Sequence, residues 1–278
     1  MRLPPISAAT AIRLQHPVHR GDHRLLVQPV RQRHLHQNAI DSLVGIEAVD
    51  LGLQPLSNGY VPLAKAATSD KFYPLHARVC DACLLVQVDS VVPPEDIFNE
   101  DYAYFSSFSD SWLKHCETYV ADMTARFGLS AASQVVEIAS NDGYMLQYFV
   151  ARGIPVLGVE PSGNTAAVAE SKGVRTEVAF FGKATAERLV ASGFAADLLA
   201  AKNVMAHVPD INDFVAGVNV MLKPEGVFTV EFPHLLTTSQ GLQFDTIYHE
   251  HFTYLSLLAV ERIFARHSLR VFDVERLT

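Results

Sequence analysis

Four consecutive residues near the end of the chain carry side chains that exchange protons or donate hydrogen bonds near neutral pH: Tyr248-His249-Glu250-His251. Metal binding is an alternative. However, ligands at such close positions fan apart, unlike the His-Glu-x-x-His spacing that places two histidines on one helix face. The cluster therefore favours general acid and base chemistry. The other interpretation is a polar loop before a helix that begins near Ser256.

A second polar group follows an apolar run. Val135-Val136-Glu137-Ile138 predicts a buried strand, and the residues from Ala139 to Gly143 predict a tight turn before a helix. A later apolar strand ends at Glu160, next to Pro161. A carboxylate inside an apolar strand is unfavourable without a partner, so Glu137 favours a functional role, with a buried structural hydrogen bond as the alternative.

The turn after the first strand has a single glycine, Gly143, and lacks the Gly-x-Gly-x-x-Gly spacing that cradles a pyrophosphate. A nucleoside cofactor without phosphates fits better, and S-adenosylmethionine is such a cofactor. Its amino acid end needs polar groups near the turn, which Glu137 or Asp142 could supply. Its ribose diol needs an acceptor at the end of the second strand, and Glu160 stands there.

Strands and helices alternate after residue 134, which indicates an α/β fold with a mostly parallel, doubly wound sheet. The predicted strands lie near residues 134–139, 155–160, 174–178, 197–202, 227–232 and 270–274. The predicted helices lie near residues 109–127, 143–152, 162–172, 182–192, 210–221 and 255–267. Because ligands bind at the carboxyl ends of parallel strands, Asn203 and His207 after the fourth strand join the candidate site.

The bulk composition excludes several classes of protein. A formal net charge of -8 over 278 residues argues against a nucleic-acid-binding surface, and no apolar run is long enough to predict a membrane span. Cys80 and Cys83 are separated by two residues, which is zinc-knuckle spacing but only half of a four-ligand site. Three cysteines predict a reducing compartment and hence a cytoplasmic protein.

The first 40 residues differ from the rest of the chain. They hold six Arg, five His and one Asp, with no Lys or Glu. This composition shows little helical or strand periodicity, and we interpret residues 1–48 as an irregular segment that is disordered or translated out of frame. Residues 49–95 then form a small β-rich module with the Cys-x-x-Cys pair, and residues 96–278 form the main domain.

Several motifs together resemble the sugar-nucleotide C-methyltransferases, in particular the C-3 methyltransferases of branched deoxysugars. The resemblance covers residues 50 to 278. The motifs are Asp50-Leu51-Gly52-Leu53-Gln54-Pro55-Leu56, Tyr73 to Cys83, Asp101-Tyr102-Ala103-Tyr104-Phe105-Ser106-Ser107, Glu137-Ile138-Ala139-Ser140-Asn141-Asp142-Gly143, Asn203 to Asp210, and Tyr248-His249-Glu250-His251-Phe252. The resemblance implies a zinc module followed by a Rossmann-like class I methyltransferase domain that binds S-adenosylmethionine. Members of the family also have a C-terminal α/β domain, which is expected to be absent after Thr278 in this chain.

The resemblance also implies roles for individual residues. His251 is the expected general base towards a nucleotide-linked 4-keto sugar, Tyr248 and Tyr102 donate hydrogen bonds to the enolate oxygen, and Glu250 and His207 are second choices. The cofactor is expected to contact Glu137, Ala139, Asn141, Asp142, Gly143, Glu160, Pro161 and Asn203, and zinc to contact Cys80 and Cys83. Two alternatives are an inactive or cofactor-binding fragment and a nicotinamide-dependent sugar-nucleotide oxidoreductase or epimerase. The oligomeric state is left open.

Overall fold

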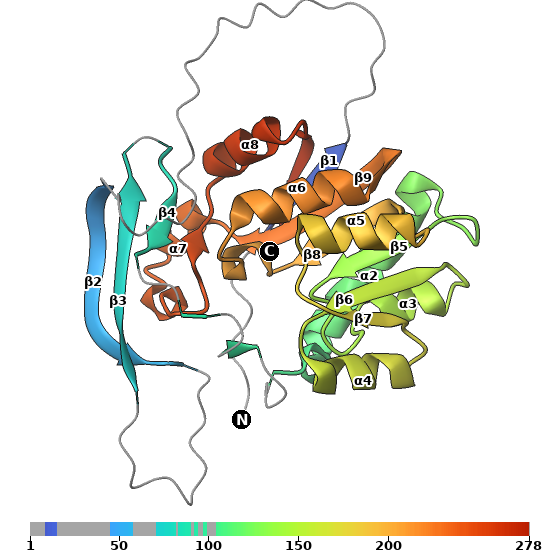
Figure 1. Cartoon of the computed structure of the whole chain (residues 1–278), viewed down its shortest axis with the longest axis horizontal. Helices are drawn as coiled ribbons and strands as arrows, with labels where there is room; N and C mark the ends of the chain where they lie inside the picture. The colour runs from blue at the N-terminus through green and yellow to red at the C-terminus, as the bar shows by residue number, and fades with distance from the viewer. Residues whose placement is uncertain are drawn as a thin grey trace, which may run out of the picture.

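The computed structural model describes residues 9–15, 45–57, 71–81, 83–89, 92–93, 97–98 and 104–277. Within these residues the chain forms a large mixed sheet flanked by helices and a smaller antiparallel sheet (Figure 1). The strand order of the large sheet is β11-β1-β9-β8-β5-β6-β7. That of the small sheet is β10-β4-β3-β2. The prediction of an α/β fold preceded by a small β-rich module is confirmed.

Five strands of the large sheet pair in parallel, as predicted. They are β5 (Val135–Ile138), β6 (Val156–Glu160), β7 (Thr176–Val178), β8 (Ala196–Lys202) and β9 (Leu222–Pro233). Between the pairs Ala196–Leu222 and Leu198–Val227, the β9 side has three extra residues. These extra residues lie in the Lys223-Pro224-Glu225-Gly226 segment, which bulges out of the ladder in accordance with its turn-forming composition.

The N-terminal segment departs from expectation. Strand β1 (Ala9–Gln15) lies between β9 and β11 (Arg270–Arg276) and is antiparallel to both. Strand β2 (Gly45–Pro55) also begins before residue 49. The interpretation of residues 1–48 as irregular throughout is therefore wrong for these two stretches. Strand pairing between distant segments depends on a ladder supplied by another part of the fold, and local periodicity does not report it.

Helices cover both faces of the large sheet. One face packs against α5 (Lys183–Ala191), α6 (Ile211–Met221) and α8 (Leu257–Arg266). The other packs against α2 (Asp110–Phe127), α3 (Leu146–Val150) and α4 (Gly163–Ser171). Side chains of β5 alternate between the two buried clusters, with Val136 on the first face and Val135 on the second. Burial on both faces explains why this strand is continuously apolar apart from Glu137.

Capping residues define where the helices begin. The Ser109 hydroxyl accepts from the Trp112 N–H at the start of α2, and the Asp210 carboxylate accepts from Asn212 and Asp213 at the start of α6. Ser256 caps α8 in the same way. These side chains satisfy N–H groups that have no partner within the helix. Helix α2 ends at Gly128, whose left-handed φ of 60° suits a residue without a Cβ.

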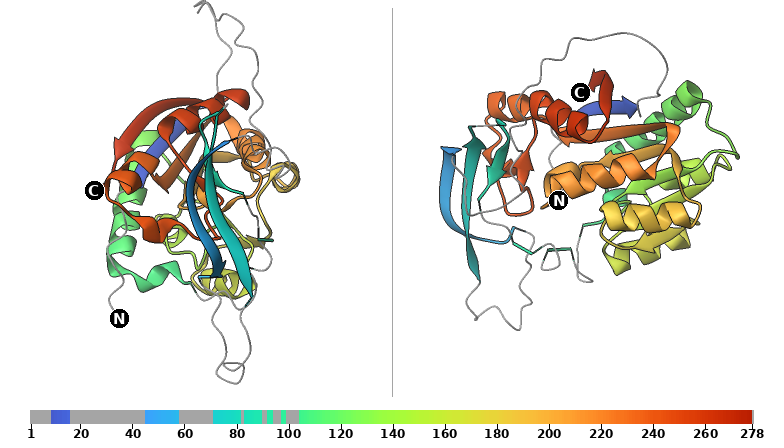
Figure 2. Two further views of the ribbon diagram at one scale, coloured as in Figure 1. Left: turned by 90° about the vertical axis from the view of Figure 1, so that its left-hand side faces the viewer. Right: turned by 45° about the horizontal axis from the view of Figure 1, so that its top comes forward.

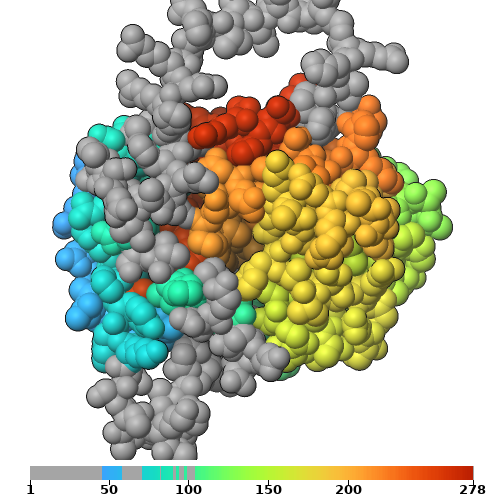
Figure 3. Space-filling model, viewed as in Figure 1, coloured from blue at the N-terminus to red at the C-terminus, as the bar shows by residue number. Residues whose placement is uncertain are grey.

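The small sheet contains β2, β3 (Phe72–Cys80), β4 (Val86–Val88) and β10 (Thr253–Tyr254). Strand β10 comes from the C-terminal part of the chain and pairs with β4, so the sheet is completed by the loop that carries His251. Figure 2 shows β10 and the short helix α7 (Leu235–Gln240) beside this sheet. Figure 3 shows the surface of β2 and β3 on one side and that of α4, α5 and α6 on the other.

Among the described helices, none has the length and apolar character needed to cross a membrane.

Candidate active site

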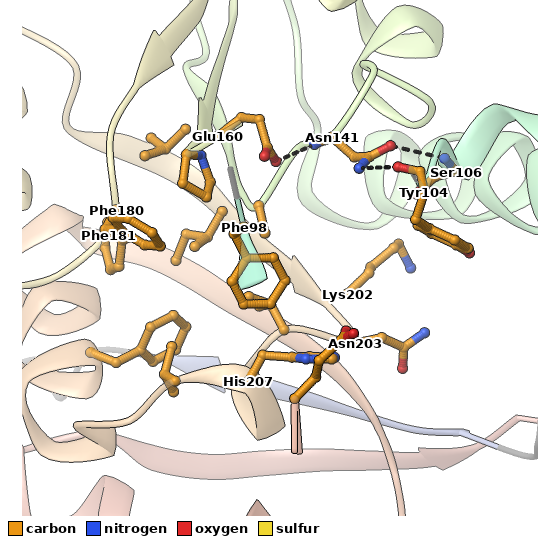
Figure 4. Close-up of a pocket in the computed structure, with 18 of the residues that line it drawn as sticks. Phe98, Tyr104, Ser106, Asn141, Glu160, Phe180, Phe181, Lys202, Asn203 and His207 are labelled. Carbon is orange, nitrogen blue, oxygen red and sulfur yellow. Dashed lines mark hydrogen bonds between the residues drawn. The ribbon is translucent and has the colours of Figure 1, made fainter. Parts of the chain in front are cut away.

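A cavity of about 610 Å³ lies at the carboxyl ends of the parallel strands. This volume is in the range of small-molecule and cofactor sites. Its lining includes nine of the predicted site residues, namely Ala139, Asn141, Glu160, Pro161, Asn203, His207, Tyr248, Glu250 and His251. Figure 4 shows some of them facing one shared space from separate elements. Segments more than 100 residues apart in the sequence therefore meet in one site.

Three lining residues other than glycine have left-handed backbone conformations. The φ angles are 54° for Ala139, 47° for Asn141 and 54° for Asn203. Asparagine tolerates this region, but alanine adopts it at a cost of order 1–3 kcal/mol. All three residues follow the end of β5 or β8. Such strain concentrates at functional sites, where surrounding structure holds the chain in a required shape.

Glu160, the last residue of β6, is fixed by backbone donors. Its two carboxylate oxygens accept from the N–H of Asn141 and of Ser162, both at 2.9 Å. Burial raises the pKa of the Glu160 carboxyl, and the N–H groups of Ser162 and Asn141 oppose that shift. Each oxygen keeps a second lone pair, so the carboxylate can still accept from the hydroxyls of a diol. The geometry thus fits the predicted ribose contact.

The side chain of Asn141 connects the turn after β5 to the segment around Tyr104. Its Oδ1 accepts from the Ser106 N–H at 2.8 Å, and its Nδ2 donates to the Tyr104 carbonyl at 3.1 Å (Figure 4). Its own N–H donates to Glu160. One residue in the turn after β5 therefore links the end of β6 to the segment around Tyr104. The described part of the 101–107 motif is thereby positioned, whereas Tyr102 lies outside the described residues.

Three predicted cofactor residues do not line the cavity. Asp142 faces α4, where its Oδ2 forms an ion pair with the Nζ of Lys172 at 3.2 Å. Gly143 has a φ of 73°, and a Cβ there would lie 3.2 Å from the Cβ of Ala169. Glu137 is fully buried in β5, and burial raises its pKa to about 8. Their positions indicate roles in the turn and the core, and the predicted direct contacts of these three residues with the cofactor find no support in the geometry.

His251 forms two polar contacts that fix its proton. Nδ1 lies 2.8 Å from the Thr246 carbonyl oxygen, which can only accept, so Nδ1 carries the hydrogen. Nε2 is then an acceptor and lies 3.0 Å from the Tyr248 hydroxyl. Burial lowers the pKa of His251 to about 4, while the Thr246 carbonyl acts in the other direction. The imidazole is therefore neutral near pH 7, with its basic nitrogen next to a hydroxyl donor.

His207 and Asn203 add polar atoms that have no partner among the described residues. The Nδ1 of His207 and the Oδ1 of Asn203 are buried and make no hydrogen bond. The His207 ring lies 4.6 Å from that of His251, and burial together with His251 holds the pKa of His207 well below its usual value. Buried polar atoms are normally satisfied, so these two favour a ligand in the cavity.

His249 differs from its neighbours in the Tyr248–His251 cluster. Its Nε2 lies 3.3 Å from the Tyr73 carbonyl oxygen, and its ring packs edge-on against the Tyr73 ring. The side chain is buried between the cluster and β3 and does not line the cavity. His249 therefore ties the loop to the small sheet.

Two groups of lining residues were not among the predicted site residues. Lys202, at the end of β8, forms a buried ion pair with Glu231 of β9, whose carboxylate also receives His115 at 3.0 Å. Burial alone would raise the pKa of Glu231, but Lys202 and His115 lower it to about 2. The second group is an apolar wall of Phe180, Phe181 and Phe214. Lys202 lies at the end of a predicted strand, and that position could have marked it as a candidate site residue.

The Cys-x-x-Cys pair lies in the turn between β3 and β4. Cys80 and Cys83 are buried free thiols, and burial raises the pKa of Cys83 to about 11. The chain has one further cysteine, Cys116, which lies on α2. In the described part of the chain, no group of three or more His, Cys, Asp or Glu side chains could hold a metal ion. A structural zinc needs four ligands, and the described residues supply two, so they do not by themselves form that site.

Two protein-family models match successive parts of the chain. Residues 112–274 match the family model described as "Methyltransferase domain", which spans more than half of the chain. The chain belongs to this methyltransferase family. The preceding residues 44–98 match a model described as "Putative zinc binding domain". The predicted enzyme class, an S-adenosylmethionine-dependent methyltransferase, is confirmed by these matches, and the nicotinamide-dependent alternative is disfavoured.

Two curated relatives are similar in sequence. "C-methyltransferase NovU" of Streptomyces niveus is 36% identical over 229 residues, which are 82% of this chain and 54% of the relative. "Ubiquinone biosynthesis O-methyltransferase" of Bartonella bacilliformis is 26% identical over 113 residues, which are 40% of this chain and 46% of that relative. The chain thus spans about half the length of the relatives that it matches. The predicted similarity to C-methyltransferases is confirmed by the first.

Two solved structures align with part of the chain. A "SAM dependent methyltransferase" from Archaeoglobus fulgidus is 14% identical with a TM-score of 0.43, covering 55% of this chain and 68% of its own. DesVI of Streptomyces venezuelae is 17% identical with a TM-score of 0.36, covering 42% of this chain and 50% of its own.

Proposed function

We propose that this methyltransferase transfers a methyl group from S-adenosylmethionine to carbon C-3 of a nucleotide-linked 4-keto deoxysugar. The observation that carries the proposal is a neutral His251 with its basic nitrogen facing the same cavity as Glu160. Carbon methylation requires removal of a C–H proton, and O-methylation of an acidic hydroxyl needs no such dedicated base. The similarity to a C-methyltransferase supports the same reaction class.

The cofactor has a suitable set of residues in this cavity. Glu160 would accept from the ribose hydroxyls, and Phe180, Phe181 and Phe214 would contact the flat face of the adenine. Asn203 offers an unsatisfied side-chain oxygen in the same cavity. When bound, S-adenosylmethionine supplies an electrophilic methyl group. The single-glycine turn at Asn141 suits such a cofactor because no pyrophosphate has to be accommodated.

The sugar would bind against the Tyr248–His251 cluster. A 4-keto group makes the C-3 hydrogen acidic, and the Nε2 of His251 takes that proton once the Tyr248 hydroxyl has turned from Nε2 to the keto oxygen. The negative charge then develops on the keto oxygen, where the Tyr248 hydroxyl donates a hydrogen bond. His207 and Glu250 line the same side of the cavity and would position the sugar. Tyr102 stays a prediction as a second donor.

The protonation states in this cluster suit the reaction. Burial and the nearby Glu250 raise the pKa of Tyr248, so the phenol keeps its proton and acts as a donor. The low pKa of His251 keeps its Nε2 unprotonated throughout the neutral range. A weak base suffices only if the developing enolate is stabilised at the same time, which explains the pairing of the imidazole with a hydroxyl.

Mass spectrometry of a nucleotide-linked 4-keto-6-deoxyhexose, incubated with the protein and S-adenosylmethionine carrying a deuterated methyl group, tests the proposal. The expected product gains one labelled methyl group, and its fragments place the label on the ring carbon. Solvent deuterium should also enter C-3 when the cofactor is replaced by S-adenosylhomocysteine. A label on oxygen would replace the proposal by O-methylation. Tight S-adenosylhomocysteine binding without any product would favour the cofactor-binding fragment.

A further inference from the structure

The cavity has a cationic side chain that none of the steps above uses. Lys202 lines the cavity at the end of β8, and its side chain is almost completely buried. A buried ammonium is unfavourable without partners, and Glu231 supplies one. The Tyr119 ring lies 3.8 Å from Nζ and the Trp112 ring 5.7 Å from it. The ammonium is thus held in place by an anion and two aromatic faces.

The position of Lys202 relative to the other lining residues indicates which ligand group it faces. In Figure 4, Phe180 and Phe181 lie at one side of the cavity and Lys202 lies at the other, with Glu160 and Asn141 between them and His207 across. A nucleoside with its base at Phe180 and its ribose at Glu160 directs its 5′ substituent towards Lys202. In S-adenosylmethionine this substituent carries an α-amino acid.

We infer that Lys202 binds the α-carboxylate of the cofactor's amino acid end, in an aromatic recess formed with Trp112 and Tyr144. This inference rests on the proposed function. An ammonium has three N–H donors, and Glu231 is the hydrogen-bond acceptor recorded for Lys202 among the described residues, so donors remain for a carboxylate. Glu231 acts as a positioning residue, because it fixes the Nζ atom without lining the cavity. Glu137 and Asp142, the predicted candidates for contact with this end of the cofactor, do not line the cavity.

Two ligands that differ only at this end provide the test. S-Adenosylhomocysteine has the α-carboxylate, whereas 5′-methylthioadenosine has the same nucleoside and sulfur without the amino acid. Calorimetric titration of Lys202→Met should show S-adenosylhomocysteine binding weakened roughly 10- to 100-fold, and 5′-methylthioadenosine binding unchanged within about twofold. A selective loss of this kind cannot come from general damage to the cavity.

The matched control is Lys223→Met. Lys223 pairs with Asp197 at 2.6 Å across the same two strands, but at their opposite ends. The Lys223→Met variant should bind both ligands with unchanged affinity. If Lys202→Met unfolds the protein because Glu231 keeps only His115 as a partner, the double variant Lys202→Met/Glu231→Leu removes the pair together, and the same selective loss is expected.

Three outcomes overturn the inference. Equal weakening of both ligands would make Lys202 a structural residue. Unchanged affinity for S-adenosylhomocysteine with a raised KM for the sugar would assign Lys202 to the substrate. Binding of both ligands to the unmodified protein with equal affinity would show that the amino acid end contributes nothing. Failure of the proposed function is distinguishable, since it shows in the product assay as a label on oxygen or as no product, whereas this titration contains no sugar.

Discussion

The Tyr248 hydroxyl lies 3.0 Å from the Nε2 of His251. From this position it can donate a hydrogen bond to the substrate oxygen as negative charge develops there. Such a donor acts mainly in the transition state. Tyr248→Phe should therefore lower kcat by roughly 100- to 1,000-fold and leave KM nearly unchanged. Steady-state kinetics with the keto-sugar nucleotide measures both constants.

Tyr254→Phe provides the control for this substitution. Tyr254 lies six residues away on β10 and does not line the cavity. The variant should keep the unmodified kcat. An equal loss in kcat and in substrate affinity for Tyr248→Phe would instead assign the hydroxyl to ground-state binding.

His251 predicts the pH dependence of the reaction. A general base works only in its unprotonated form, and burial lowers the pKa of this imidazole to about 4. The logarithm of kcat/KM should therefore be flat from about pH 8 down to about pH 5.5, and should fall only as the pH approaches 4. An acidic limb near the ordinary histidine pKa of about 6.5 would contradict this assignment. The variant His251→Asn should have a much lower kcat/KM at neutral pH, and its pH profile should lack the fall near pH 4.

Glu137 gives a prediction about stability. Its pKa is raised to about 8 in the folded protein by burial, and it lies near 4.5 in the unfolded chain. Between these values the folded state keeps a proton that the unfolded state has released, so the free energy of unfolding falls as the pH rises. The slope due to this group approaches about 1.4 kcal/mol per pH unit.

Glu137→Gln should remove that slope between about pH 5 and 8, as measured by urea denaturation across the range. Glu187, which is 57% exposed on α5, gives the matched control, and Glu187→Gln should retain the slope of the unmodified protein. Identical pH profiles for Glu137→Gln and the unmodified protein would show that the carboxyl has a partner that keeps it ionised.

At the scale of elements, the loop with His251 is held by the small sheet. The Val88 N–H donates to the Phe252 carbonyl at 3.0 Å, and the Phe252 N–H donates to Ala206 at 2.8 Å. The Phe252 side chain packs with Leu75 and Val88. The small sheet therefore positions the proposed base, although it contributes no side chain of its own to the Tyr248–His251 cluster.

Phe252→Ala tests this coupling. Removing a buried phenylalanine costs about 3–5 kcal/mol, and here it also loosens the loop. We expect kcat/KM to fall at temperatures where the protein is still folded. Phe264→Ala on α8 removes an equally buried ring outside this loop and should lower stability without a comparable loss of activity. Parallel losses of activity in the two variants would remove the positioning role of the small sheet.

Sequence patterns predicted the regular part of the fold because β5, β6, β8 and β9 are rich in buried apolar residues, and because α2, α6 and α8 begin at capping side chains. They also placed Glu160 and Asn203 at one edge, because the carboxyl ends of parallel strands coincide. His251 follows no parallel strand, and its role as the base was predicted only from the family resemblance. Strand β1 could not be predicted, since its partners β9 and β11 lie more than 200 residues away. Nor could the sequence predict that the side chains of Glu137 and Asp142 point away from the cavity, because their direction depends on tertiary contacts such as that of Asp142 with Lys172.

At the scale of the whole molecule, both sheets share one buried cluster. Cys80, Cys83 and Leu85 pack in the same apolar cluster as Leu255, Val260 and Ile263. The turn that would hold zinc in a complete site is thus packed against α8, and the Arg262 guanidinium donates to the Cys83 carbonyl at 3.2 Å. Apolar packing can replace a metal as the source of order in this turn.

The protein should therefore be stable without zinc. Two thiols satisfy half of a tetrahedral site, and among the described residues no third His, Cys, Asp or Glu completes a metal-binding group with them. Purified protein should contain well under one zinc per chain by elemental analysis, and a chelator should leave the Tm unchanged. Cys80→Ala/Cys83→Ala should lower the Tm only by the packing of two small side chains, and equally with and without chelator. Stoichiometric zinc, together with a Tm that falls on chelation in the unmodified protein and not in this variant, would contradict the argument.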